Sequence, residues 1–151
     1  MFEMVRSAED NRRPRNGQSH VTGRRDAPLW EETIPVCFAR ALSRFANREA
    51  AIFPEQDIRV SYAELARDVD SLALGLLQLG LRTGDRIGIW SPNRYEWLLA
   101  QFATARVGII LVTINPAYRT DELEYAVNKV GCKALILADS FKSSNYLDMI
   151  D

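Results

Sequence analysis

The stretch VGIILVTINPAYRTDELEYAV, residues Val107–Val127, combines three local patterns in succession. Ile109–Ile114 is almost entirely apolar, which predicts a strand that is covered on both faces. Pro116 restricts Asn115 to extended backbone, and the Asn side chain can hydrogen-bond its own backbone, so a sharp turn should follow. Thr120 can then cap a helix. Phosphate-binding loops share this strand–turn–helix layout, but this turn lacks the glycines and the lysine that they need.

The neighbouring segments repeat the same alternation. RIGIW, Arg86–Trp90, predicts a strand, and Asn93 can cap a helix from Arg94 to Arg106. KALILA, Lys133–Ala138, predicts a third strand, and the piece after Asp139 is expected to start another helix. Strands that alternate with helices at this spacing form a parallel sheet with right-handed connections. The fold class is therefore α/β, a partial doubly wound parallel sheet with flanking helices. Because three strands leave a bare apolar edge, the sheet is expected to continue in another segment.

The segment before this alternation predicts a helix, a hairpin and a second helix. Thr33 can cap the first helix. AAIF (Ala50–Phe53) and IRV (Ile58–Val60) flank a short polar turn, as expected for a hairpin. Ser61 and Glu64 have the spacing of a capping box, in which each side chain satisfies a free backbone N–H at a helix start.

Length and charge limit the classes of function. The chain has 151 residues, enough for one domain, and its net charge of −1 gives no strong attraction to nucleic acid or anionic lipid. No apolar run is long enough for a transmembrane segment. Residues 1–30 lack hydrophobic periodicity and are predicted to be a flexible leader before a domain at 31–151. The leader holds six Arg and four acidic residues, so a cytoplasmic location is favoured, with the mitochondrial matrix as the alternative.

The residue types that carry chemistry are sparse. His20, the only histidine, lies in the predicted leader, which argues against histidine-based acid–base or metal chemistry. Cys37 and Cys132 lack metal-ligand spacing and are expected to be reduced core thiols. The carboxylate pairs are expected on solvated helix faces: Asp68/Asp70 and Glu122/Glu124. Trp90, Trp97 and Tyr125 are expected in the core or at subunit contacts. We therefore predict no catalytic, cofactor-binding or metal-binding residue in this chain.

Two longer stretches resemble a known family. VSYAELARDVDSLALGLLQLGLRTGDRIGIWSPNRYEW, residues 60–97, and ATARVGIILVTINPAYRTDELEYAVNKVGCKALI, residues 103–136, resemble two consecutive blocks in the N-terminal part of AMP-forming acyl-CoA synthetases. These enzymes belong to the adenylate-forming, AMP-binding superfamily. The second block is especially similar to medium-chain fatty acyl-CoA ligases of the family-member-two type. The resemblance covers residues 30–151, which would then be an incomplete N-terminal AMP-binding-type α/β domain, truncated before the phosphate loop.

The resemblance implies a two-step ligase. A fatty acid attacks the α-phosphate of ATP to give an acyl-adenylate and pyrophosphate, and coenzyme A then displaces AMP to give acyl-CoA. Mg2+ would neutralise the phosphates. The family's lysine-ended phosphate loop, ribose-binding aspartate and C-terminal lysine have no counterpart here. Two segments, Tyr118–Asp121 and Thr83–Asp85, imitate the family's Tyr-x-Thr-Gly-Asp ribose motif, but both are expected to be structural turns.

Three hypotheses about function follow. The chain is expected to be an N-terminal segment of a fatty acid–CoA ligase, inactive alone, whose full-length form uses ATP, Mg2+ and coenzyme A. The alternative is a non-catalytic interaction module or remnant that pairs with a full-length synthetase through its bare sheet edge or its apolar helix faces. A homo-oligomer is also possible. An independent Rossmann-like nucleotide-binding domain is disfavoured, because the glycine fingerprint is absent.

Overall fold

The predicted parallel sheet is present. β3 (Arg86–Trp90) lies in the middle, with β4 (Ile110–Ile114) along one edge and β5 (Ala134–Leu137) along the other. Both pairings are parallel and without a bulge. Ile87 therefore lies opposite Leu111 on one side and opposite Ala134 on the other. The alternation of strands and helices predicted from the sequence gives the correct set of strands.

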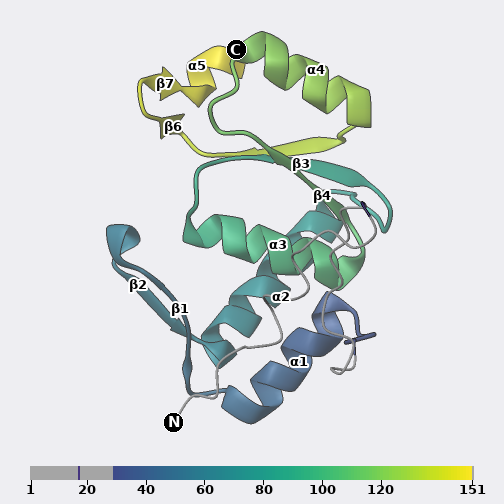
Figure 1. Ribbon diagram of the computed structural model, residues 1–151, viewed down its shortest axis with the longest axis vertical. Coiled ribbons are helices and arrows are strands. Elements are labelled where there is room, and N and C mark those ends of the chain that lie inside the picture. The colour runs from purple at the N-terminus through teal and green to yellow at the C-terminus, as the bar shows by residue number, and fades with distance from the viewer. Residues whose placement is uncertain (1–16, 18–28, 151) are drawn as a thin grey trace. The chain divides into compact units, whose positions relative to one another are not determined.

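The computed structural model describes residue 17 and residues 29–150 (Figure 1). The predicted leader, His20 included, lies almost wholly outside these described residues, so the 1–30 and 31–151 division stays a prediction. Residues 32–151 form one compact unit. In the described part of the chain, no helix is long and apolar enough to cross a membrane.

Helices cover both faces of the sheet. α3 (Tyr95–Val107) connects β3 to β4, and α4 (Thr120–Val130) connects β4 to β5 past the central strand. The chain thus moves across the sheet in one direction and then in the other. Because such connections are right-handed, this reversal places α3 and α4 on opposite faces, as Figure 1 shows. The doubly wound fold class is confirmed.

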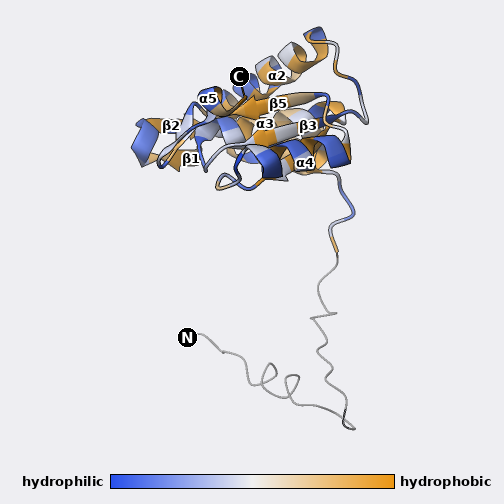
Figure 2. Ribbon diagram, turned by 90° about the horizontal axis from the view of Figure 1, so that it is seen from above, coloured by the Kyte–Doolittle hydropathy of each residue, from blue (hydrophilic) through white to orange (hydrophobic). Residues whose placement is uncertain are grey.

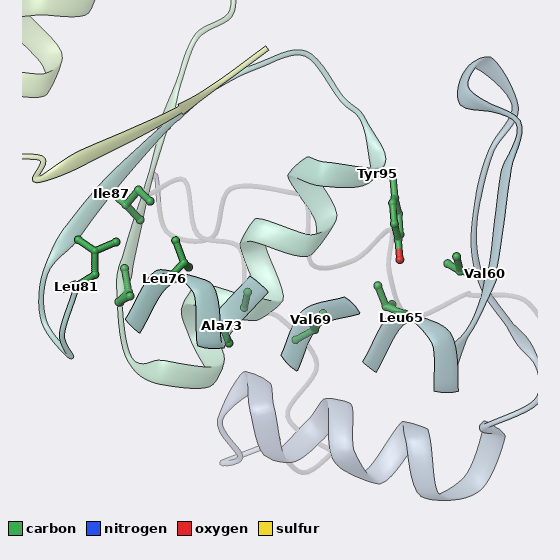
Figure 3. Close-up of a cluster of buried hydrophobic side chains, with 10 residues drawn as sticks. Val60, Leu65, Val69, Ala73, Leu76, Leu81, Ile87 and Tyr95 are labelled. Carbon is green, nitrogen blue, oxygen red and sulfur yellow. The ribbon is translucent and has the colours of Figure 1, made fainter. Parts of the chain in front are cut away.

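Two hydrophobic clusters fill the space between the sheet and its helices. On one face, α3 packs on the strands, and α1 (Ile34–Phe45) and α2 (Tyr62–Gln78) pack against α3 (Figure 3). The cluster there consists of buried aliphatic side chains around Tyr95: Val60, Leu65, Val69, Ala73, Leu76, Leu81, Ile87, Ala103 and Ile109. On the other face, a smaller cluster lies under α4: Trp90, Ile114, Leu123, Ala138 and Tyr146. Burial of one such large aliphatic side chain contributes about 1.5–3 kcal/mol.

Gly88 allows close packing at the centre of the sheet. A Cβ at this position would lie 2.8 Å from Cδ1 of Leu135 and 3.0 Å from Cδ1 of Ile114. Any side chain at position 88 would therefore force the neighbouring strands or their side chains apart. Figure 2 shows the apolar character of the central strands and the hydrophilic side of α4.

The predicted hairpin is confirmed. β1 (Glu49–Phe53) pairs antiparallel with β2 (Ile58–Ser61), and a short 3-10 helix, η2 (Pro54–Gln56), forms the tip. Asp57 has a φ of 52°, a left-handed conformation that Asp tolerates better than most residues. The hairpin therefore ends in a compact turn, from which the side chain of Gln56 reaches the start of α3.

Of the four predicted helix caps, two are confirmed in position and two are wrong. Thr33 lies at the N-cap of α1, although its side chain makes no capping hydrogen bond. Ser61 and Glu64 form the predicted capping box at the start of α2. The N-cap of α3 is Arg94, not Asn93, and the free N–H of Tyr95 in the first turn donates to Oε1 of Gln56 on the hairpin tip. The cap of α4 is Arg119, and Thr120 is already helical.

The Thr120 hydroxyl lies 3.5 Å from the Met149 carbonyl oxygen, a tertiary contact that replaces its predicted capping role. The α4 N-terminus is instead satisfied by Glu122, whose carboxylate accepts the Arg119 N–H at 2.9 Å. Position 119 is therefore held in cap geometry from within the helix, one residue earlier than the sequence predicts.

One further expectation is wrong, and another needs a change of position. β4 is not covered on both faces, because it lies at the sheet edge, and Ile110 is 45% exposed. The expected helix after Asp139 is present, but it does not start at once. A two-residue pair of strands, β6 (Ser140–Phe141) and β7 (Ser144–Asn145), comes first, and α5 (Tyr146–Ile150) starts only afterwards. Short polar residues here favour a turn, which sequence periodicity alone does not resolve.

Candidate functional site

The turns after the parallel strands are the best placed part of the chain for a ligand. In open α/β sheets, ligands bind outside the carboxyl ends of neighbouring strands whose connections leave toward opposite faces. β3 and β5 are such a pair, because β3 leads to α3 on one face and β5 leads to α5 in the cluster on the other. The candidate site therefore consists of residues 91–94, 115–119 and 138–145.

Arg94 and Asp139 bridge the two strand ends. Nη1 of Arg94 lies 3.4 Å from Oδ1 of Asp139, and Nε of Arg94 lies 3.2 Å from Oε2 of Glu96. A cavity of about 270 Å³ lies beside these groups, lined by Ser91, Trp97 and the end of β5. The guanidinium thus faces two carboxylates, so it offers no excess positive charge to a phosphate.

A second hollow, of about 480 Å³, lies between the hairpin tip and the turn after β3. Its lining includes Phe53, Gln56 and Asn93. Oε1 of Gln56 accepts the backbone N–H of Tyr95 at 2.7 Å, and Nε2 of Gln56 donates to the Glu96 carboxylate at 3.0 Å. Gln56 therefore holds the start of α3 from a separate element. Burial raises the pKa of Glu96, but the hydrogen bond from Gln56, its backbone N–H and Arg94 outweigh that effect and leave the pKa lowered.

The turn after β4 is fully engaged in structural contacts. Oδ1 of Asn115 accepts the Ala117 N–H at 2.9 Å, as the sequence predicts. The Asn115 carbonyl accepts the indole N–H of Trp90 at 3.2 Å, and the Pro116 carbonyl accepts the hydroxyl of Tyr146. Burial raises the pKa of Tyr146, so this hydroxyl keeps its proton as a donor. The turn therefore works as an anchor between the strands.

The two imitations of a ribose motif lie at opposite ends of the parallel strands. Residues 83–85 precede β3, whereas residues 118–121 follow β4. The Thr83 hydroxyl donates to the Val107 carbonyl at 2.8 Å, and the Gly84 N–H donates to the Gly108 carbonyl at 2.8 Å. Asp85 is paired with Lys133 at 2.6 Å. Each member of the first imitation has a structural partner, and the second is divided between a turn and the start of α4.

The candidate carboxylates, aromatic residues and thiols also remain apart. The Asp68 carboxylate accepts the Tyr95 hydroxyl at 2.6 Å, and Asp70 pairs with Arg106 at 3.0 Å, so α2 and α3 are linked. Burial and the Asp68 charge raise the pKa of Tyr95. Trp90 is buried as predicted, whereas Tyr125 is exposed. Both cysteines are free and half-buried.

A magnesium ion finds no fitting donor set among residues 17 and 29–150. No group of three or more His, Cys, Asp or Glu side chains lies close enough there to hold a metal ion. In the turn after β4, the Asn115 side chain and the Pro116 carbonyl are engaged within the chain, as described above. The described residues therefore do not fit Mg2+ by themselves, and our prediction of no site residues stays a prediction.

Comparison with known proteins identifies the family. Residues 38–150 match the family described as AMP-binding enzyme. This chain belongs to the AMP-binding enzyme family. A medium-chain acyl-CoA ligase, ACSF2, mitochondrial, of Rattus norvegicus is 45% identical over 137 residues, which are 91% of this chain and 22% of that protein.

Two further comparisons support the same family assignment. The putative acyl-CoA synthetase YngI of Bacillus subtilis is 35% identical over 83% of this chain and 23% of its own length. The solved structure of a Mycobacterium tuberculosis fatty acyl CoA synthetase superposes with a TM-score of 0.67 at 25% identity, over 70% of this chain and 21% of that one. This chain thus spans about a fifth of the length of the curated relatives that it matches.

Three residues that organise the candidate site were missed by sequence reasoning: Gln56, Asp139 and Tyr146. Gln56 acts on a residue 39 positions away, and Asp139 acts on one 45 positions away. Neither contact leaves a local pattern in the sequence. The sequence offered one clue to these residues, which is their position in the chain. Residues that directly follow parallel strands lie together at the carboxyl ends of those strands.

Proposed function

We propose that this chain forms the first sheet unit of an AMP-forming fatty acid–CoA ligase. The observation that carries the proposal is the 45% identity with a medium-chain acyl-CoA ligase over 137 residues. The ligase activity belongs to a polypeptide, or an assembly, of the length of that relative. Its substrates would be a fatty acid, ATP and coenzyme A, with Mg2+ as the metal, and its products acyl-CoA, AMP and pyrophosphate.

In such an enzyme, the residues of this chain would shape and stiffen one wall of the active site. Trp90 and Tyr146 fix the turn after β4, and Gln56 fixes the start of α3. Preorganised surroundings lower the reorganisation needed when charge develops in a reaction. Because the described residues hold no group of side chains that could bind Mg2+, we assign them no step in the transfer of the adenylyl group.

A chimera tests the proposal. Residues 1–150 of this chain would replace the matched segment of the rat medium-chain ligase, and AMP release would be followed with octanoate, ATP, Mg2+ and coenzyme A. We expect fatty-acid-dependent AMP release from the chimera. The 151-residue chain alone, as the matched control, should release none.

A folded chimera without activity would contradict the proposed ligase function. The alternative role, a non-catalytic module, is tested with the same material. If the chain associates with the full-length rat ligase on gel filtration and the chimera is inactive, the interaction module is favoured.

We also propose the mitochondrial matrix as the location. The rat relative carries the word mitochondrial in its name, which favours our alternative over the cytoplasmic prediction. A fusion of the full chain to a fluorescent protein, with residues 1–30 present or removed, tests this. Matrix fluorescence that requires residues 1–30 is expected, and diffuse cytoplasmic fluorescence of both forms would contradict the location.

A further inference from the structure

The candidate site carries two cations that have no carboxylate partner. Its three segments hold the basic side chains of Arg94, Arg119 and Lys142, and a single carboxylate, that of Asp139. Asp139 is paired with Arg94, which also contacts Glu96. In the described part of the chain, neither Arg119 nor Lys142 forms an ion pair with a carboxylate. These segments therefore keep an excess of positive charge, although the net charge of the whole chain is −1.

One hydrogen bond places the two cations on adjoining turns. Nη1 of Arg119 donates to Oγ of Ser144 at 2.9 Å, which ties the turn after β4 to β7. Ser144 lies opposite Phe141 in the β6–β7 pair, so Lys142 and Ser143 form the turn directly beyond them. Lys142 has a φ of 53°, a left-handed conformation that tight turns use. The two cationic side chains therefore start from turns that touch each other after β4 and β5.

The same turns also carry hydrogen-bond donors that remain available. The hydroxyl of Ser144 accepts from Arg119, so its own proton is left to donate. A guanidinium has five N–H donors, and one of those in Arg119 is used by Ser144. The nearby carboxylate of Glu122 is engaged with the backbone N–H of Arg119 at 2.9 Å. Several donors can therefore converge on one anion.

A phosphate group suits these donors better than the carboxylate of a fatty acid does. Phosphate oxygens accept hydrogen bonds from several directions, and both Arg and Lys are common phosphate ligands. Arg119, Lys142 and Ser143 are exposed, so they provide no apolar wall for an acyl chain. The chemistry of the two turns is therefore that of a site for a hydrated, multiply charged anion.

We propose that Arg119 and Lys142, with the hydroxyls of Ser143 and Ser144, bind a phosphate group of a nucleotide substrate. Ligands of open α/β sheets bind at this end of the strands. The identity of the substrate rests on the proposed ligase function, in which ATP and coenzyme A both carry phosphates. The proposal departs from the sequence prediction that this chain has no cofactor-binding residue.

Titration of the 151-residue chain tests the binding itself. Coenzyme A, ATP without Mg2+ and sodium phosphate are added separately, and the NMR shifts of the Ser143 and Ser144 amides are followed. We expect saturable shifts with coenzyme A or ATP, and weaker binding as salt screens the charges. Arg119→Gln and Lys142→Asn should each raise the Kd by about twofold to fivefold. Asn tolerates the left-handed backbone at position 142.

Arg82→Gln is the matched control, because Arg82 is also exposed but precedes β3, at the opposite ends of the strands. It should leave the Kd unchanged. Equal weakening by Arg82→Gln and Lys142→Asn overturns the site in favour of a general charge effect. Equal binding of sodium phosphate to all variants shows an adventitious ion only, and it also overturns the site. If Arg119→Gln does not fold, Lys142→Asn decides alone.

The chimera with the rat ligase identifies the source of the phosphate. If Lys142→Asn raises the KM for coenzyme A and not that for ATP, the phosphate belongs to coenzyme A, and the reverse result assigns it to ATP. If the chimera is active and neither KM changes in either variant, the site is overturned and the ligase function stands. If the chimera releases no AMP but binding to the chain depends on both cations, the ligase function fails and the phosphate site stands.

Discussion

The rings of Trp90 and Tyr146 stack with their centroids 3.6 Å apart and their planes 12° from parallel. Both side chains are fully buried. Trp90 ends the central strand, and Tyr146 begins α5. Their polar atoms hold consecutive carbonyls, those of Asn115 and Pro116, at the end of β4. One aromatic pair thus ties together the end of β3, the turn after β4 and the helix after β5.

We expect replacement of this pair to be costly in proportion to the contact removed. Tyr146→Phe keeps the stack and removes the hydrogen bond to Pro116, so it should lower the free energy of unfolding by about 1–3 kcal/mol. Trp90→Ala removes the stack and leaves a cavity, so it should cost about 3–5 kcal/mol. Urea denaturation of the full chain measures both. Equal losses for the two variants would show that the hydroxyl, rather than the stack, dominates.

The hairpin tip should stabilise α3 through Gln56. Gln56→Ala leaves the Tyr95 N–H without its partner and should lower the free energy of unfolding by about 1 kcal/mol. Gln56→Glu keeps an acceptor for that N–H but places a second carboxylate beside Glu96, which it should repel. We therefore expect Gln56→Glu to be more stable in mildly acidic than in neutral solution, relative to the unmodified chain.

The neighbouring Glu55 supplies the control for the hairpin tip. Glu55 is exposed on the same turn, so Glu55→Ala should change stability by less than about 0.5 kcal/mol. Thermal unfolding at two pH values compares the three variants. If Glu55→Ala and Gln56→Ala are equally destabilising, the effect belongs to the 3-10 turn and not to the hydrogen bonds of Gln56.

The sequence was sufficient for those parts of the fold that depend on local patterns. Apolar periodicity located β3, β4 and β5, and the Ser61–Glu64 spacing located the capping box, because these features involve residues close in sequence. Asn93 and Thr120 failed as caps because distant or neighbouring groups satisfied the helix starts instead. Local propensity cannot show that Gln56 reaches Tyr95.

The order of the strands also lay beyond the local pattern. The apolar run at the sheet edge predicted a fully covered strand, and β4 is instead exposed at Ile110. How far a strand is covered by the rest of the chain depends on whether it lies in the centre of the sheet or at its edge. β3 lies in the centre, although it is no more apolar than β4 and β5. The network of Arg94, Glu96 and Asp139 follows from that order, since it joins the ends of β3 and β5.

Acid should weaken the pairing of Asp85 with Lys133. The hydrogen bond from Lys133, followed by the Arg82 N–H, lowers the pKa of Asp85 in the folded chain. A group with a lowered folded-state pKa stabilises the fold fully above its unfolded pKa, about 3.9, and loses that contribution as the pH falls below it. Asp85→Asn should therefore lower the melting temperature at pH 7 and make stability less dependent on pH between about 5 and 2.

A matched aspartate distinguishes this pairing from a general charge effect. Asp57 is exposed in a left-handed turn, where Asn is equally well tolerated. Asp57→Asn should leave both the melting temperature at pH 7 and its acid dependence nearly unchanged. Parallel behaviour of the two variants would mean that net charge, not the contact with Lys133, causes the acid sensitivity.

Two glycines that end helices should differ in their tolerance of a side chain. Gly108 and Gly131 have φ values of 73° and 65°, so alanine at either position should cost about 1–2 kcal/mol in backbone strain. A Cβ at position 108 would also lie 2.7 Å from Cγ2 of Thr83, whereas nothing lies within 4 Å at position 131. Gly108→Ala should therefore be the more destabilising, by about 1–3 kcal/mol for the overpacking.

Removal of the opposing methyl group should reverse only the steric part. Thr83→Ser keeps the hydroxyl that donates to the Val107 carbonyl and deletes Cγ2. In combination with Gly108→Ala, it should restore stability toward that of Gly131→Ala, whereas added to Gly131→Ala it should restore nothing. A double-mutant cycle by urea denaturation measures this coupling. Additive effects in the first pair would show that the turn yields to the new side chain, and that residues 83 and 108 are not in tight contact.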